Sequence, residues 1–493
     1  MLYDILISSH LDETKYVISD TVTHLTNSQI DQICSQIQIL LTHYNIKSQD
    51  RIVIYAERTI TTVLIILACI RMGVCFVPVS PGISEESLFE LIESAEPSLI
   101  IGDFNIKCNI SCICADEIIS MAKQEDSSIK PPVVNDPIVY ILYTSGSTGI
   151  PKGVIAEEDN VIFCIHAINK RLQNNASDRI LCCLPLSFDY GLYQIFLALA
   201  SGAYLILLPE ELPFQKIISF LAIENITGFP AMPAMLSMLL RTRLLPKANL
   251  SSIRYITSTG DNLPVFLIQK IQEAIPSAEV IPMYGLTECK RVSIMPIGRY
   301  DKVIAGSCGL PLDEVKVWLD DKNSDGIGEL IISGKNIMSG YWRDLDETKK
   351  YYFTDKSGKR CLRSGDFFKI DEDGFLYFIS RKKDILKVNG YRIGIVELEN
   401  KLYSEMKDLI YEIGVFGYPD TIVGERIAVC ISTSYPTEQI IKRLRTVSEH
   451  LSSYQRPNLV YCTKQPLPKN INGKIDRKKL KEMGLNIDFV KFK

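Results

Sequence analysis

The chain has 493 residues, of which 46% are hydrophobic and 23% charged, and its formal net charge is −4. This length predicts about three domain-sized units, and the negative charge excludes the basic surface typical of nucleic-acid binding. We find neither a run of about eighteen apolar residues nor a basic leader with a small-residue cleavage site, so we expect a cytoplasmic protein without membrane insertion.

The first hundred residues alternate helical and strand patterns. The sequence after Leu25 opens a helix that Asn27 or Ser28 can cap. A strand is predicted at residues 51–55, an apolar helix at 61–71 and a further strand before Ser80. Alternating strands and helices predict a largely parallel sheet covered by helices.

An apolar run at residues 138–143 ends abruptly in hydroxyls and glycines, in the sequence Thr-Ser-Gly-Ser-Thr-Gly-Ile-Pro-Lys-Gly. Glycines let backbone N–H groups converge on an anion, and the hydroxyls and the lysine add donors and positive charge. A Walker A loop is excluded because Lys152 is followed by Gly153. The residues that predict a polyphosphate site here are Thr144, Ser145, Gly146, Ser147, Thr148, Gly149 and Lys152.

Asp189 lies in the apolar sequence Leu-Pro-Leu-Ser-Phe-Asp-Tyr-Gly, after a helix predicted at residues 159–172. A carboxylate is costly to bury there without a partner. It either caps a helix or forms a turn, or it binds a ligand, and the residues alone leave both open. Residues 192–208 predict a buried helix, a turn and a strand.

The sequence Tyr-Gly-Leu-Thr-Glu at residues 284–288 follows a predicted strand. Tyr284 offers an aromatic face to a purine, Thr287 a hydroxyl donor, and Glu288 a hard oxygen ligand of the kind Mg²⁺ uses beside phosphates. Upstream, a strand ends in a turn at Gly260 and Asp261.

Asp366 lies in the sequence Leu-Arg-Ser-Gly-Asp-Phe-Phe, and its carboxylate can accept hydrogen bonds from two ribose hydroxyls. The acidic turn at residues 371–374 is predicted to be a solvated loop. The pattern from residue 394 onward predicts helix, strand, strand, helix and strand, followed by the lysine-rich sequence Asn-Gly-Lys-Ile-Asp-Arg around Lys474.

Cys108, Cys112 and Cys114 form one cluster among 14 cysteines and five histidines. No second ligand group lies near them in the sequence, so free thiols are predicted rather than a metal site.

These motifs, in this order, resemble those of the adenylate-forming superfamily, which includes acyl-CoA synthetases, luciferases and amino-acid adenylation domains. The resemblance covers nearly the whole chain and implies an α/β fold. Residues 1–380 would form a large domain of mixed, mainly parallel sheets with helices and a β-rich subdomain. Residues 381–493 would form a small, mobile α+β domain that carries the catalytic lysine.

The resemblance also implies ATP and Mg²⁺ as cofactors, and a phosphopantetheine thiol, on a carrier protein or on CoA, as the acyl acceptor. Lys474, Glu288 and Thr287 would be catalytic, Glu288 would bind the metal, Lys383 would be the hinge, and Gly390 would let the pantetheine arm pass. Besides the polyphosphate loop and Lys152, the implied nucleotide-binding residues are Gly260, Asp261, Tyr284, Gly285, Asp366, Phe378 and Arg381.

Phe188-Asp189 resembles the Phe-Asp pattern of amino-acid adenylation domains, in which the aspartate pairs with the substrate ammonium group. The flanking Leu-Pro-Leu and Tyr-Gly look more like acyl-CoA synthetases, and Lys383 is more typical of fatty-acyl ligases. We therefore expect a stand-alone amino-acid adenylation enzyme that loads a separate carrier protein; the alternative is an acyl-CoA synthetase or acyl-carrier-protein ligase. The implied substrate pocket comprises Asp189, Tyr190, Tyr193, Thr257, Thr259, Met283, Arg291 and Val292.

Arg291 either binds an acidic group or faces solvent, and the sequence leaves this open. A nucleotide-binding regulator without catalysis is disfavoured because Glu288, Asp366, Arg381 and Lys474 are all present.

Overall fold

The structure is a computed structural model, and the fold and the site are described for the following residues. They are residues 1–7, 14–20, 22–103, 110–134, 136–144, 151–210, 212–213, 215–242, 244–245, 248–261, 263–382, 385–388, 391–420, 424–469, 475–485 and 490–491. The predicted site residues Ser145, Gly146, Ser147, Thr148, Gly149, Lys383, Gly390 and Lys474 lie outside them, as does Cys108.

A seven-stranded sheet forms the centre of the N-terminal part, in the order β18-β8-β7-β4-β3-β5-β6. Strands β4, β3, β5, β6 and β7 run parallel, whereas β8 and β18 are antiparallel additions at one edge. All of β4 is buried, as expected for a parallel strand covered on both faces. The strands are β3 (Arg51–Tyr55), β4 (Cys75–Val79), β5 (Leu99–Ile101), β6 (Cys112–Ile113), β7 (Ile138–Thr144), β8 (Lys152–Glu157) and β18 (Gly340–Tyr341).

A nine-stranded sheet follows, in the order β15-β14-β13-β12-β11-β9-β10-β1-β2. Its central strands, from β13 to β1, are parallel. The strands are β1 (Tyr16–Ser19), β2 (His24–Thr26), β9 (Arg179–Cys182), β10 (Tyr204–Leu207), β11 (Gly228–Pro230), β12 (Tyr255–Ser258), β13 (Glu279–Tyr284), β14 (Ser293–Ile294) and β15 (Leu310–Pro311).

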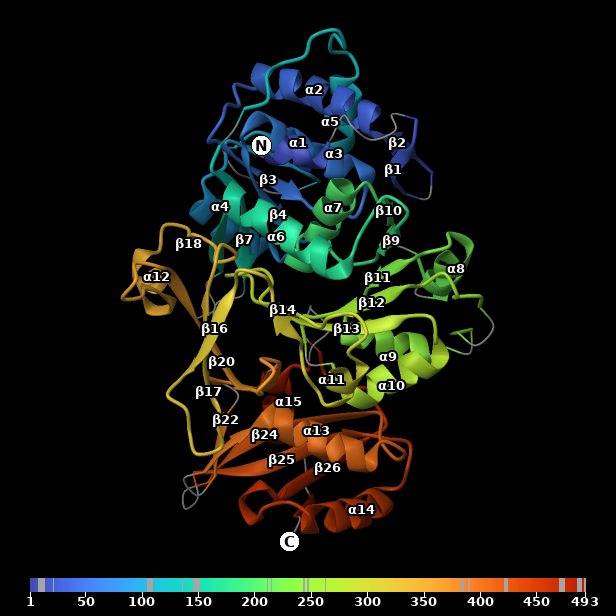
Figure 1. Cartoon of the computed structure of the whole chain (residues 1–493), viewed down its shortest axis with the longest axis vertical. Coiled ribbons are helices and arrows are strands. Elements are labelled where there is room, and N and C mark those ends of the chain that lie inside the picture. The colour runs from blue at the N-terminus through green and yellow to red at the C-terminus, as the bar shows by residue number, and fades with distance from the viewer. Residues whose placement is uncertain are drawn as a thin grey trace.

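Helices cover these two sheets (Figure 1). They are α1 (Leu2–Leu6), α2 (Asn27–His43), α3 (Ile60–Met72), α4 (Glu85–Ala95), α5 (Ala115–Ala122), α6 (Glu158–Leu172), α7 (Asp189–Ser201), α8 (Gln215–Ile223), α9 (Pro233–Arg241), α10 (Val265–Ala274) and α11 (Tyr300–Ile304). The predicted cap of α2 is wrong by one or two residues. Thr26 is the N-cap, because its hydroxyl accepts from the Gln29 N–H while the Gln29 side chain accepts from the Thr26 N–H.

A third, antiparallel sheet is the predicted β-rich part, with β21 added to the order β16-β17-β20-β19. Its elements are β16 (Lys316–Asp320), β17 (Gly328–Ser333), α12 (Leu345–Tyr351), β19 (Tyr352–Thr354), β20 (Arg360–Ile370) and β21 (Leu376–Arg381). The acidic turn that follows β20 is not simply solvated. The Lys302 ammonium lies 2.8 Å from a carboxylate oxygen of both Asp371 and Asp373, so two ion pairs connect the turn to α11.

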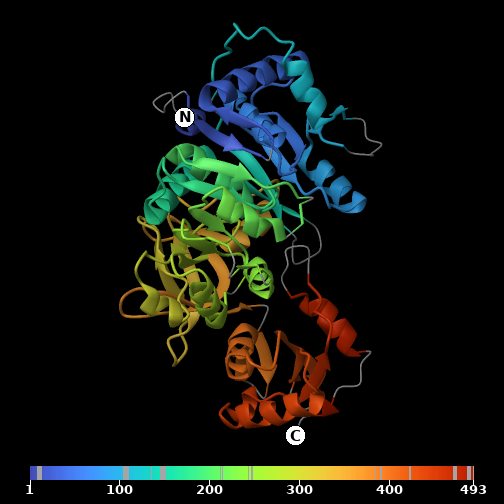
Figure 2. The same cartoon turned by 90° about the vertical axis from the view of Figure 1, so that its right-hand side faces the viewer.

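The C-terminal residues form a six-stranded sheet with its own hydrophobic core (Figure 2). The predicted order of helix, strand, strand, helix and strand is confirmed, and a further helix and strand follow it. The elements are β22 (Ile385–Val388), β23 (Tyr391–Gly394), α13 (Ile395–Met406), β24 (Glu412–Asp420), β25 (Gly424–Ser432), α14 (Thr437–Glu449), β26 (Leu459–Thr463), α15 (Arg477–Leu485) and β27 (Val490–Lys491).

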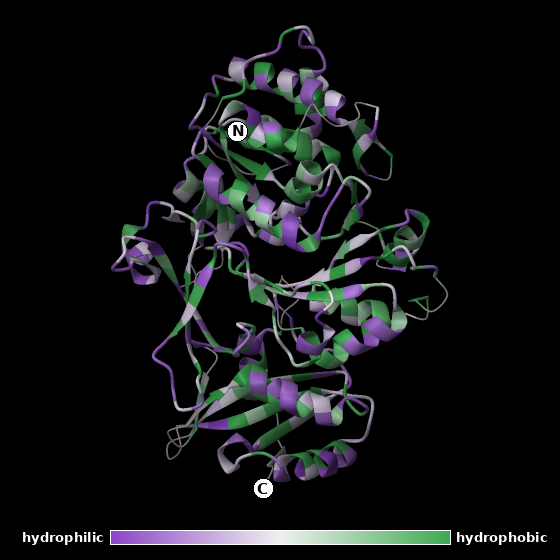
Figure 3. Ribbon diagram, in the orientation of Figure 1, coloured by the Kyte–Doolittle hydropathy of each residue, from purple (hydrophilic) through white to green (hydrophobic). Residues whose placement is uncertain are grey.

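Alternation along β24 separates the two faces of this sheet. Val415 packs in the cluster that contains Leu398 of α13 and Leu444 of α14, whereas Phe416 packs with Leu480 of α15 on the other face. Helix α14 is correspondingly amphipathic, with apolar and polar residues interleaved along it (Figure 3).

Aromatic contacts join the C-terminal sheet to the N-terminal part. The rings of Phe266 in α10 and Tyr403 in α13 stack with their centroids 3.9 Å apart. The guanidinium of Arg241 lies 5.7 Å from the ring centroid of Tyr411. These contacts place α13 against the end of the nine-stranded sheet that carries α9 and α10.

Within the described residues, no helix has the length and apolar character needed to cross a membrane. Cys112 and Cys114 are free thiols, as are the other described cysteines.

Asp178 is a buried carboxylate at the start of β9, and it accepts from Arg254 at 2.9 Å and from Thr227 at 2.7 Å. We expect Asp178→Ala to lower the free energy of unfolding by about 2 kcal/mol, because the cation and hydroxyl lose their partner. The matched control Asp313→Ala removes an exposed partner of Lys170 and should cost under about 1 kcal/mol. Urea denaturation of both variants measures this, and equal losses would contradict the assignment.

Candidate functional site

Three predicted nucleotide-binding residues meet where β13, β20 and β21 come together. The Tyr284 hydroxyl donates to Asp366 Oδ2 at 2.8 Å, and Arg381 Nε lies 3.5 Å from Asp366 Oδ1. Asp366 and Arg381 are register partners in the β20–β21 pair. Burial, and then the adjacent Asp366 carboxylate, raise the pKa of Tyr284 well above its ordinary value, so the phenol stays protonated and remains a donor.

Aromatic rings hold Tyr284 in place. Its ring meets Phe368 edge-on with centroids 4.7 Å apart, and Phe368 meets Phe378 edge-on at 5.5 Å. This edge-to-face geometry is favourable for aromatic pairs. The predicted residue Phe378 is therefore connected to Tyr284 through Phe368. The sequence did not single out Phe368.

The two predicted glycine turns need glycine for different reasons. Gly260 follows β12 and has φ +90°, a left-handed conformation that favours glycine. A Cβ there would be in ordinary contact with the Phe188 ring at 3.6 Å, so this turn lies beside the Phe188-Asp189 segment. A Cβ on Gly285 would lie 2.0 Å from the carbonyl oxygen of Lys290, which only glycine permits. Asp261, next to Gly260, is exposed.

The described ends of the polyphosphate loop are register partners, since Thr144 of β7 pairs with Lys152 of β8. The Lys152 ammonium is bound in an ion pair to Glu347 of α12, and it lies 5.7 Å from the centroid of the Tyr341 ring. The cation predicted to bind phosphate is therefore already balanced by a carboxylate of the chain.

Tyr341 also reaches the predicted metal ligand. Its hydroxyl donates to Glu288 Oε1 at 2.8 Å, and burial together with Glu288 raises its pKa, so it stays a donor. The Met338 N–H donates to the carbonyl of Glu288 at 2.9 Å. These bonds fix the turn that carries Thr287, which is partly exposed. Tyr341 thus brings Glu288 and Lys152 into one cluster.

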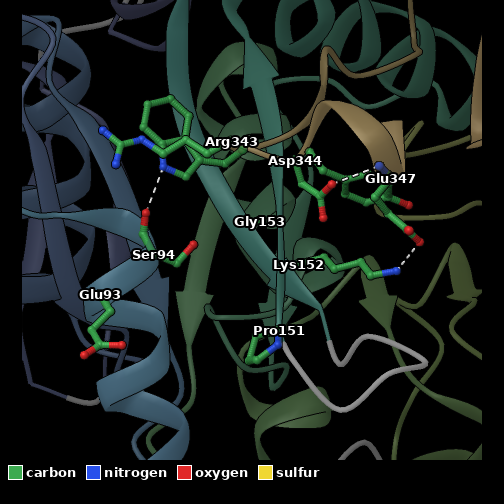
Figure 4. A pocket seen from close by; sticks show the side chains of 10 residues that line it. Glu93, Ser94, Pro151, Lys152, Gly153, Arg343, Asp344 and Glu347 are labelled. Carbon is green, nitrogen blue, oxygen red and sulfur yellow. Dashed lines mark hydrogen bonds and ion pairs between the residues drawn. The ribbon is translucent and has the colours of Figure 1, made fainter. Parts of the chain in front are cut away.

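A pocket of about 480 Å³ opens beside this cluster (Figure 4). In Figure 4 the Lys152 side chain extends toward Glu347. Trp342 also lines the pocket, and its indole N–H donates to the Ser94 carbonyl at 3.0 Å. Its lining residues are Glu93, Ser94, Pro151, Lys152, Gly153, Tyr341, Trp342, Arg343, Asp344 and Glu347.

Asp189 is the first residue of α7 but does not cap it. The N-cap is Phe188, which makes no side-chain capping bond, so the capping interpretation is wrong. The Asp189 side chain instead meets Lys290, whose ammonium lies 3.1 Å from Oδ2 and 2.6 Å from the Asp189 carbonyl oxygen. Burial lowers the pKa of Lys290, and the Asp189 carboxylate opposes this effect by stabilising the charged ammonium.

The other predicted substrate residues form a buried shell beyond this pair. The Tyr190 hydroxyl lies 2.7 Å from Thr257 Oγ1, and Arg291 donates to Thr259 Oγ1 at 3.0 Å. Arg291 is 3% exposed, so the solvent-facing alternative is wrong. Its guanidinium lies 5.5 Å from the Tyr190 ring centroid, within cation–π range. Tyr193, Met283 and Val292 are buried too.

The sequence reasoning missed Lys290, Asn336, Tyr341 and Glu347. Lys290 had a usable signal, because it directly follows the Thr-Glu-Cys sequence and precedes Arg291. Asn336, which is fully buried, donates to the carbonyls of Cys289 and Arg291 at 3.1 and 3.0 Å. No local pattern marks a buried asparagine that binds a turn 45 residues away.

Comparisons with known proteins agree with this arrangement. The family model of the AMP-binding enzymes matches residues 8–342. Tyrocidine synthase 3 of Brevibacillus parabrevis is 27% identical over 477 residues; the match covers 92% of this chain and 7% of that protein. The chain thus spans less than a tenth of the length of that relative.

Two solved structures share the fold. ATP-bound MatB from Rhodopseudomonas palustris has a TM-score of 0.88 and 21% identity, and the match covers 98% of each chain. The anthranilate CoA ligase AuaEII, in complex with anthranoyl-AMP, has a TM-score of 0.86 and 20% identity over 99% of this chain and 98% of the other. The α/β fold with mainly parallel sheets and a β-rich part, predicted from the sequence, is therefore confirmed.

The Lys152–Glu347 ion pair predicts opposite effects from removing its two members. Glu347→Gln should bind ATP about three- to tenfold more tightly, because Lys152 no longer has to leave a carboxylate to meet a phosphate. Lys152→Met should bind ATP at least about tenfold more weakly. Isothermal titration with ATP measures both.

Lys350→Met is the matched control, because Lys350 contacts the same Glu347 from the exposed side and should leave ATP affinity nearly unchanged. Weaker ATP binding by Glu347→Gln would contradict the prediction, because the Lys152–Glu347 pair would then be part of the nucleotide-bound state.

Proposed function

Because the chain belongs to the family of AMP-binding enzymes, we propose that it is an ATP-dependent, AMP-forming ligase. It activates a carboxylic acid as an acyl-adenylate and transfers the acyl group to a phosphopantetheine thiol. The observation that carries this proposal is the meeting of Tyr284, Asp366 and Arg381, a buried ring, a buried carboxylate and a partly exposed guanidinium suited to an adenosine. Glu288, which follows Thr287 in the same motif, accepts a hydrogen bond from Tyr341, and the ring of Tyr341 lies near the Lys152 ammonium.

In the first step a carboxylate oxygen of the substrate attacks the α-phosphorus of ATP. The bond between the α-phosphorus and the bridging oxygen breaks, and pyrophosphate leaves with that oxygen's electron pair. No proton has to move, and both reactants are anions, so catalysis consists of alignment and neutralisation of charge.

Cations and donors of the chain would supply that neutralisation. Lys152 and the hydroxyl and N–H donors of residues 144–149 would bind the departing pyrophosphate, and Thr287 would donate to the α-phosphate. Lys474 would bridge the substrate carboxylate and the α-phosphate oxygens. Asp366 would accept from the ribose hydroxyls, and its contact with Tyr284 would hold it for that role.

Glu288 fits a Mg²⁺ ion that is held mainly by phosphates and water. Among the residues that the structure describes, no group of three or more His, Cys, Asp or Glu could form an all-protein metal cage. Mg²⁺ typically takes one or two carboxylates together with substrate phosphates. When bound, the ion would neutralise phosphate charge. The hydrogen bond from Tyr341 to one oxygen of Glu288 would orient the carboxylate.

The second step needs a different position of the C-terminal part. We propose that residues 381–493 turn about Lys383 after pyrophosphate leaves, so that the thiol reaches the adenylate past Gly390. The thiol sulfur bonds to the acyl carbon, its proton is lost to solvent, and AMP leaves. Such a movement would break the stacking of Phe266 on Tyr403 and the contact of Arg241 with Tyr411.

Two classes of acid are candidates for the substrate. An amino acid loaded onto a separate carrier protein is supported by the likeness to tyrocidine synthase 3 and by Phe188-Asp189. An acid without an α-amino group, transferred to CoA or to a carrier protein, is supported by the likeness to anthranilate CoA ligase, whose aryl acid has no α-amino group, and by the partner that Asp189 already has.

The direct test of the proposed activity is ATP–pyrophosphate exchange dependent on an added carboxylate. Lys474→Ala should lower exchange by about 100- to 1,000-fold, because one charged contact to the reacting groups is lost. The same variant should still form thioester from supplied acyl-adenylate.

The matched control is Lys469→Ala, which removes a nearby lysine that pairs with Glu412 and should retain exchange. Loss of both half-reactions in Lys474→Ala would contradict the assignment of Lys474 to the first step alone.

A further inference from the structure

A lysine of the chain pairs with Asp189, the carboxylate that the family resemblance assigns to a substrate ammonium group. The Lys290 ammonium lies 3.1 Å from Asp189 Oδ2, and its side chain is 1% exposed. It also lies 3.9 Å from the centroid of the Tyr193 ring. A buried ammonium and a buried carboxylate each need a partner, and these two provide one for each other.

The backbone around Lys290 is built to hold this side chain in place. Lys290 has φ +53°, in the left-handed region. Gly285 leaves room for its carbonyl, and Asn336 binds the carbonyls of the residues on either side, Cys289 and Arg291. A side chain fixed in this way is a constant part of the pocket.

The charges around Asp189 leave little room for another cation. The Lys290 ammonium lies over the Tyr193 ring, and its charged or titratable neighbours besides Asp189 are the Cys164 thiol and Arg291, the next residue in the chain. Arg291 is buried, and its Nε has no hydrogen-bond partner among the described residues. Two buried cationic side chains, Lys290 and Arg291, are therefore already present here, and Asp189 pairs with the first of them. A substrate ammonium would be a third cation in a buried place, where repulsion between like charges is strong.

We propose, on the basis of the proposed adenylate-forming function, that Lys290 supplies the ammonium that Asp189 would otherwise take from the substrate. The chain then activates carboxylic acids that lack an α-amino group and rejects the matching α-amino acids. Lys290 is the specificity-determining residue, and it acts by occupying Asp189. An acid without the amino group leaves the Lys290–Asp189 pair intact and brings no competing charge.

The test is ATP–pyrophosphate exchange with matched pairs of acids that differ only in the α-amino group. The pairs are propionic acid and alanine, isocaproic acid and leucine, phenylpropionic acid and phenylalanine, succinic and aspartic acid, and octanoic and aminooctanoic acid. For the pair that fits the pocket, wild type should prefer the acid without the amino group by at least about 100-fold in kcat/KM.

Lys290→Met should shift this ratio toward the amino acid by about tenfold or more, because Asp189 is freed to bind the substrate ammonium. The double variant Asp189→Asn/Lys290→Met should lose that shift, because no carboxylate remains. Lys302→Met is the matched control: it removes a lysine from a remote pair with Asp371 and should keep the wild-type ratio.

Wild-type exchange that favours the amino acid would overturn the inference and leave the proposed function standing. The wild-type ratio decides this even if Lys290→Met does not fold. Absence of exchange with every pair and with aryl acids would contradict the proposed function itself, and the inference with it.

Discussion

Repulsion between anions is the constraint on which the arrangement of this site depends. In the proposed reaction a substrate carboxylate must approach a polyphosphate, so positive charge has to be in place in the protein before either arrives. The chain stores it in ion pairs. Lys152 is held by Glu347, and Arg381 lies beside Asp366. A ligand at such a place exchanges partners with a carboxylate of the chain, so the partner carboxylates tune affinity as much as the cations do.

Other predicted site residues lie at the ends of parallel strands, where open α/β sheets bind their ligands. Tyr284 ends β13, Thr257 lies near the end of β12, and the polyphosphate loop follows β7. Buried tyrosines then connect the pieces, since Tyr284 donates to Asp366 and Tyr341 to Glu288. Because burial raises the pKa of both phenols, these bonds persist over the ordinary pH range.

The local sequence pattern was enough to predict much of this structure, but it could not predict which residues pair across the fold. The alternation of apolar runs predicted the parallel sheets. The Tyr-Gly-Leu-Thr-Glu sequence was predicted to follow a strand; the strand ends at Tyr284, and Glu288 follows it. Asp189 shows the limit: its cost of burial pointed to a partner, but that partner, Lys290, lies 101 residues away. Asn336 and Glu347 were missed for the same reason, because their roles depend on contacts across the fold.

The measurement that tests the central claim most directly is the affinity for two stable acyl-adenylate analogues. Each is an acyl-sulfamoyl-adenosine, and the two differ only in the presence of an α-amino group. Their dissociation constants need no turnover and no acceptor thiol. The Lys290–Asp189 pair predicts that the analogue without the amino group binds at least about tenfold more tightly. Tighter binding of the amino analogue would contradict the account, because Asp189 would then be available to the substrate.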